Sequence, residues 1–221
     1  MVLPLVLLVI IGYINKDGFT CEFTSYQYYF IGVLIFIYSG IGTNISFNFI
    51  DKDNKSGNLR TIFAPVNNKM IYISHIFSAL SFAFITLLVN LITFKFIFEV
   101  DFSESALMIF LVLLSVVFVS SSIGILFSLI IDDAVIIEEI FTVFQLLFCF
   151  IGGCFFSIES IANIPQFIIY LSPIKYVMDG LLQSMYENSN TLSFIIIFIN
   201  VIIGSILIKV SSLFFKEENY V

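Results

Sequence analysis

The chain has 221 residues, of which 60% are hydrophobic and only 11% are charged, and its formal net charge is −7. A typical soluble domain is roughly 45–50% apolar and about 25% charged, so this chain has too little polar surface to cover a soluble fold. Intrinsic disorder is excluded as well, because it requires low hydrophobicity and high charge. The excess of acidic over basic residues disfavours nucleic-acid binding. The composition therefore indicates an integral membrane protein.

Uncharged stretches divide the chain into membrane spans, because a helix needs about 20 apolar residues to cross the hydrocarbon core of a bilayer. Backbone groups in hydrocarbon must be hydrogen-bonded within their own segment, so these stretches are predicted to be helices. Glu138 and Glu139 are expected to prevent the fifth span from starting earlier. The six predicted spans, of which the first is short, are 1–15, 23–50, 71–94, 106–131, 140–157 and 191–208.

A seventh apolar stretch, 161–174, is too short for a spanning helix and contains Pro165 and Pro173. Prolines more often end or bend a helix than carry a function of their own. We expect this stretch to be a re-entrant or interfacial segment between the fifth and sixth spans, within an extracytoplasmic region 158–190. The predicted fold is all-α: one transmembrane domain over residues 1–221, with six spans and this re-entrant segment.

The basic residues orient the chain. If the N-terminus is cytoplasmic, six of the nine Lys and Arg residues fall on the cytoplasmic side, as the positive-inside rule requires. Four of these six lie in the loop 51–70, the only sizeable soluble stretch predicted on that side. Apolar residues of this loop follow helical spacing. The loop is interpreted either as an amphipathic helix on the membrane surface or as a docking element for a cytoplasmic partner.

Several small or polar residues fall where an apolar helix is predicted, and two interpretations stay open for each set. The amide side chains either hydrogen-bond to neighbouring helices at a seam or line a substrate path; they are Asn90, Gln145 and Asn200. The glycine pair Gly152–Gly153 is either a helix end with close packing or a hinge for the re-entrant segment.

The motifs of the common catalytic sites do not occur in the sequence. There is no G-x-x-x-x-G-K-[ST] motif, so the chain is not expected to bind ATP through a P-loop. A single His supplies little for metal or nucleophile chemistry, and no pair of acidic residues lies well inside two spans. We therefore predict a non-enzymatic membrane protein without a cofactor or a bound metal.

Two stretches resemble the permeases of type-2 ABC exporters. Gly57–Asn58–Leu59, followed by Ala64–Pro65 and an apolar helix, is similar to the family's cytoplasmic loop, although the family usually has Thr where this chain has Asn58. The second match resembles the end of the family's fifth helix and the Pro-bearing segment that follows it. It runs through Gly152, Gly153, Cys154, Phe155, Phe156, Ile158, Glu159, Ile164, Pro165, Leu171, Ser172, Pro173, Ile174 and Tyr176.

The resemblance implies the membrane subunit of an ATP-driven exporter. In that family, two permease copies form a homodimer or heterodimer in the membrane, and each engages a separate cytoplasmic ATPase that hydrolyses the ATP. Membrane lipid is a further expected partner, the expected location is the cell membrane, and the expected source is a prokaryote. The residues implied in coupling to the ATPase are Gly57, Leu59, Arg60 and Pro65.

Two other interpretations stay open. The family usually has an amphipathic cytoplasmic helix before its first span, whereas here Met1 opens inside that span. This departure favours the alternative of a non-transporting membrane scaffold, or an immunity or assembly factor. A secondary transporter is less well supported, because such proteins usually carry ionisable residues near the bilayer midplane.

Overall fold

A computed structural model of the protein describes residues 25–50, 69–97, 105–131, 133–155, 166–187 and 189–214. Within these ranges, five helical segments are long and apolar enough to cross a membrane. They are Gln27–Ile50, Met70–Phe96, Ala106–Ile130, Ala134–Ile151 and Thr191–Phe214. They correspond to the second to sixth predicted spans and confirm an all-α polytopic membrane protein. The first predicted span, 1–15, lies outside the described residues.

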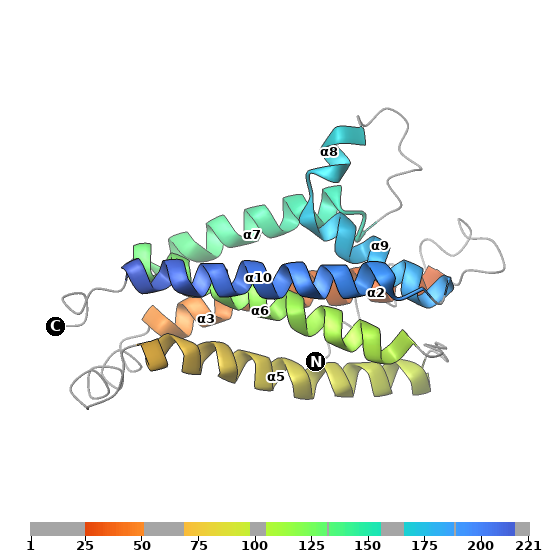
Figure 1. Ribbon diagram of the computed structural model, residues 1–221, viewed down its shortest axis with the longest axis horizontal. Helices are drawn as coiled ribbons and strands as arrows, with labels where there is room; N and C mark the ends of the chain where they lie inside the picture. The colour runs from red at the N-terminus through yellow and green to blue at the C-terminus, as the bar shows by residue number, and fades with distance from the viewer. Residues whose placement is uncertain are drawn as a thin grey trace.

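The spans form a bundle around α6, which packs against α2, α3, α5, α7, α9 and α10. In Figure 1, α3 ends, α5 begins and α10 ends at the same end of the bundle, while α9 meets the start of α10 at the other. The helices of the described residues are α2 (Ser25–Ser39), α3 (Ile41–Ile50), α5 (Lys69–Ile97), α6 (Ala106–Ile130), α7 (Ala134–Ile151), α8 (Gln166–Tyr170), α9 (Pro173–Tyr186) and α10 (Thr191–Phe214).

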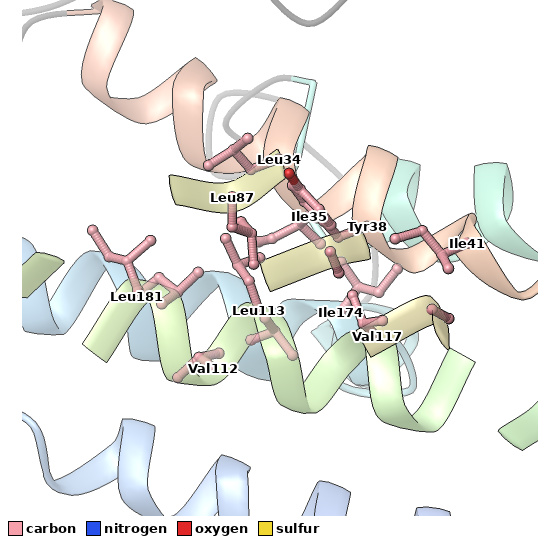
Figure 2. Packing of buried hydrophobic residues seen from close by; sticks show 14 of the residues in the cluster. Leu34, Ile35, Tyr38, Ile41, Leu87, Val112, Leu113, Val117, Ile174 and Leu181 are labelled. Carbon is pink, nitrogen blue, oxygen red and sulfur yellow. The ribbon is translucent and has the colours of Figure 1, made fainter. Parts of the chain in front are cut away.

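Aliphatic side chains fill the centre of the bundle, where four helices meet. Figure 2 shows Val112 and Leu113 of α6 packed among Leu34 of α2, Leu87 of α5 and Leu181 of α9, all of them fully buried. Large apolar side chains also cover the outside. On α5, Phe82 and Phe96 are 64% and 81% exposed. An apolar exterior of this kind is stable against lipid and not against water.

The start of α7 differs from the sequence prediction. The helix begins at Ala134, and the Asp133 side chain caps it by accepting a hydrogen bond from the Val135 backbone N–H at 2.9 Å. Glu138 and Glu139 therefore lie inside the span and are exposed, so the prediction that they prevent the span from starting earlier was wrong. A charge is costly at the centre of a bilayer but far less so near its edge, and both carboxylates lie within the first two turns of the helix.

The short helix α8 lies in the predicted re-entrant stretch 161–174, and α9 begins at its end and continues beyond it. In Figure 1, α8 projects away from the bundle, whereas α9 lies against it. With 14 residues, α9 is too short to cross a bilayer, yet it contacts α2, α6, α7 and α10. Pro173 is the first residue of α9, a position where its missing N–H is not needed by the helix. Pro165 lies outside the described residues.

Candidate functional site

The second span is broken at Gly40, where α2 ends at Ser39 and α3 begins at Ile41. A break in a span frees backbone carbonyl groups, and lipid cannot supply hydrogen bonds to them. Side chains of two other helices do so here. Ser120 Oγ of α6 donates to the Ser39 carbonyl, and Gln145 Nε2 of α7 donates to the Phe36 carbonyl. Side chains that are distant in the sequence therefore provide hydrogen bonds to the carbonyl groups that the break frees.

Immediately beyond the break, α3 and α6 approach each other backbone to backbone. The Gly42 N–H donates to Ser120 Oγ at 2.9 Å, and Ser46 Oγ donates to the Gly124 carbonyl at 2.8 Å. A Cβ atom built on Gly124 would lie only 2.3 Å from the Gly42 carbonyl oxygen. Small residues at a membrane helix interface allow such close contact, so this crossing fixes α3 against α6.

A groove with a volume of about 370 Å³ lies beside the break, between α6, α7, α9 and α10. Most of its surface is apolar, and four of the side chains in it are phenylalanines: Phe127, Phe141, Phe144 and Phe148. Polar atoms come from Ser39, Ser120, Gln145 and Asn200. None of the described residues that line the groove is ionisable. The groove is thus a neutral, mainly apolar site with a few hydrogen-bonding groups, which is typical of small-molecule sites.

The structure separates the three predicted amide side chains. Gln145 and Asn200 both line the groove, and Asn200 Nδ2 donates to Ser115 Oγ of α6 at 2.9 Å. Asn90 lies elsewhere: it is buried between α5 and α2, where its Nδ2 donates to the Tyr38 hydroxyl at 2.9 Å. Two of the three therefore come together at one site, while the third joins two helices.

The glycine pair ends α7. Gly153 has a φ of 82°, in the left-handed region that favours glycine, and the Cys154 N–H donates to the Cys149 carbonyl at 3.0 Å. This is the hydrogen bond of a Schellman motif, which satisfies a carbonyl at a helix C-terminus. A Cβ atom on Gly152 would lie 2.9 Å from Cγ2 of Ile174. The pair thus terminates α7 and lets the start of α9 pack closely against it.

Sequence reasoning singled out Gln145 as a residue that hydrogen-bonds to a neighbouring helix or lines a path, but it missed the break at Gly40 that Gln145 and Ser120 complete. The available signals were the dipeptide Ser39–Gly40 inside an uncharged stretch and the serine at position 120 of α6. The residues implied in coupling, Gly57, Leu59, Arg60 and Pro65, lie outside the described residues. Within the described ranges, no group of three His, Cys, Asp or Glu side chains could hold a metal ion.

The bundle and its groove define a polytopic α-helical membrane protein with a mainly apolar groove between its helices. The family model for the ABC-2 type transporter matches residues 1–186. Because this match covers most of the chain, the protein belongs to that family and is a transmembrane component, a permease, of an ABC transporter. The family resemblance predicted from the sequence is confirmed. Comparison with individually curated proteins gives no match.

Proposed function

We propose that the chain is the membrane-spanning permease subunit of an ATP-driven exporter in the cell membrane of a prokaryote. A separate cytoplasmic ATPase hydrolyses the ATP, and a second permease chain, identical or related, completes the transporter. The observation that carries this proposal is the family match over residues 1–186. The groove beside the broken span supports it, because non-helical backbone at membrane depth is tolerated where it is buried in protein or lines a cavity.

In this proposal the groove forms part of the translocation path, and Gln145 and Asn200 are its polar lining. Asn90 belongs to a helix seam through its bond to Tyr38. In this proposal α7 is the wall that moves; it packs more closely against α3 than against α6, although only three residues separate α6 from α7 in the sequence. A rigid-body displacement of α7 would widen the groove.

Coupling to the ATPase is proposed to run through the cytoplasmic loop 51–70. Gly57 and Pro65 shape its backbone, Leu59 supplies an apolar contact, and Arg60 pairs with an acidic groove on the ATPase. The region 158–190, which includes α8 and α9, lies on the opposite side of the membrane in this arrangement. Movement of the ATPases on binding ATP would thereby reach the helices as rigid-body displacement.

The test is affinity purification of the tagged chain from its own membranes in mild detergent, followed by identification of partners and an assay of ATP hydrolysis. We expect a stoichiometric ATPase. Leu59→Asp should release the ATPase without loss of membrane insertion, whereas Asn67→Asp, which adds the same charge to the same loop, should retain it. A well-folded preparation without any ATPase would contradict the proposal and favour a non-transporting scaffold.

A further inference from the structure

The groove discriminates between ligands by charge. Its described lining residues carry no ionisable side chain, and its walls are dominated by phenylalanine and branched aliphatic residues. Moving a charge from water into such surroundings without a partner of opposite charge carries a penalty of several kcal/mol. The groove therefore strongly disfavours an anion or a cation in comparison with a neutral molecule of the same shape.

The polar atoms of the groove add a second criterion. Gln145 Nε2 donates to the Phe36 carbonyl and to Ser39 Oγ, and Asn200 Nδ2 uses one of its two N–H groups to donate to Ser115 Oγ. Among the described residues, no group donates to the two amide oxygens, Gln145 Oε1 and Asn200 Oδ1. Both side chains line the groove. The groove thus offers hydrogen-bond acceptors, which match a ligand that carries a donor.

The size of the groove sets the third criterion. A volume of about 370 Å³ lies within the range of roughly 300–1,000 Å³ found for small-molecule sites. Phe144, which forms part of the α7 wall, is 53% exposed, so the groove is reached from the surface of the bundle. An acyl chain of a resident phospholipid would fit the apolar walls, but it has no donor for the amide oxygens.

We infer that this groove binds one neutral, largely apolar small molecule that carries a hydrogen-bond donor, and that the transporter exports this class of compound. The inference rests on the proposed function, because it takes the groove to be part of the path. The ligand reaches the groove past α7, its apolar body packs against the phenylalanine rings, and its donor meets Gln145 or Asn200.

The probe for this inference is N-phenyl-1-naphthylamine, which is neutral, mainly apolar and carries one N–H donor. Binding to the purified chain in nanodiscs is followed by dye fluorescence, with empty nanodiscs as the baseline. We expect saturable binding. The anionic relative 8-anilinonaphthalene-1-sulfonate, which has the same aromatic groups plus a sulfonate, should bind more than about tenfold more weakly.

Two residues of α7 provide a matched pair of variants. Phe144 lines the groove and Phe150 does not, although their side chains are 53% and 54% exposed. Phe144→Ala should weaken dye binding by about fivefold or more, and Phe150→Ala should leave it unchanged. The double variant Gln145→Leu with Asn200→Leu should weaken binding of the N–H dye by about three- to tenfold and leave its N-methylated form unaffected.

Three results would overturn the inference: no saturable dye binding, equal binding of the sulfonated dye, or equal effects of Phe144→Ala and Phe150→Ala. A phospholipid that co-purifies one to one and blocks the dye would overturn it too, since the groove would then hold a structural lipid. The assay uses neither ATP nor an ATPase. If the dye does not bind, the inference about the ligand is wrong and the proposal of ATP-driven export is unaffected. If the permease binds the dye but recruits no ATPase, only the proposed function is contradicted.

Discussion

The crossing of α3 and α6 depends on the absence of a single methyl group. A Cβ atom on Gly124 would lie 2.3 Å from the Gly42 carbonyl oxygen, whereas ordinary contact begins at 3.4 Å. Both partners are helix backbone, so neither can rotate away as a side chain could. In Gly124→Ala, the two helices must separate by roughly the difference between these two distances.

This separation has a cost that the structure allows to be estimated. Overpacking by one methyl group in a well-packed interior costs about 1–3 kcal/mol. The separation also lengthens the bonds from Ser46 Oγ to the Gly124 carbonyl and from the Gly42 N–H to Ser120 Oγ. Each hydrogen bond between membrane helices contributes about 0.6 kcal/mol. We therefore expect Gly124→Ala to lower the free energy of unfolding by about 2–4 kcal/mol.

Reversible unfolding by sodium dodecyl sulfate in mixed micelles, followed by circular dichroism, measures this loss. Gly204→Ala on α10 is the control, because the atom nearest its added Cβ, at 2.4 Å, belongs to the ring of Phe118, a side chain that can turn. The control should lose less than about 1 kcal/mol. A change of under about 0.5 kcal/mol in Gly124→Ala, the range of an ordinary surface substitution, would refute the close crossing.

Three further predictions use the same unfolding assay. Gly153→Ala should destabilise the protein by about 1–2 kcal/mol, since an alanine at a φ of 82° is strained; an unchanged midpoint would contradict the helix-end role. A double-mutant cycle between Tyr38→Phe and Asn90→Leu should give a coupling of about 0.6 kcal/mol, and additive effects would show that the seam bond contributes nothing. Gln145→Leu should cost about 0.5–1.5 kcal/mol, because the Phe36 carbonyl loses its donor from α7 and keeps only Ser39 Oγ of its own helix; Leu146→Ala on the exposed face of α7 is the neutral comparison.

The spans were predictable because their signal is local. The fourth predicted span, 106–131, differs from Ala106–Ile130 by one residue, since apolar content over one helix length decides it. The fifth was predicted six residues too late. A rule that excludes every acidic residue from a span ignores depth: Glu138 and Glu139 lie in the first two turns of α7, and a charge costs far less near the end of a span than at its centre.

The site was predictable only in part, because its members are defined by their neighbours. Asn90, Gln145 and Asn200 are alike in sequence, as each is an amide in an apolar stretch. Their surroundings in the fold distinguish them: Asn90 faces Tyr38 of α2, whereas Gln145 and Asn200 border the groove. The Ser39–Gly40 dipeptide was a weak signal of the break, because glycine is common in membrane helices and the donors to the freed carbonyl groups come from helices that are distant in the sequence.

The broken second span also has a consequence for the synthesis of the chain. Ser120, which donates to the Ser39 carbonyl, is synthesised 81 residues after Ser39, and Gln145, which donates to the Phe36 carbonyl, is synthesised 109 residues after Phe36. At about 5–20 residues per second, the ribosome needs on the order of 4–20 s to deliver Ser120 and Gln145. During that interval the Phe36 carbonyl has a local donor, Ser39 Oγ at 2.9 Å, but the Ser39 carbonyl has no tertiary donor and lipid offers none. The nascent span must therefore remain beside the insertion machinery, or cross the bilayer as one unbroken helix, until α6 and α7 arrive.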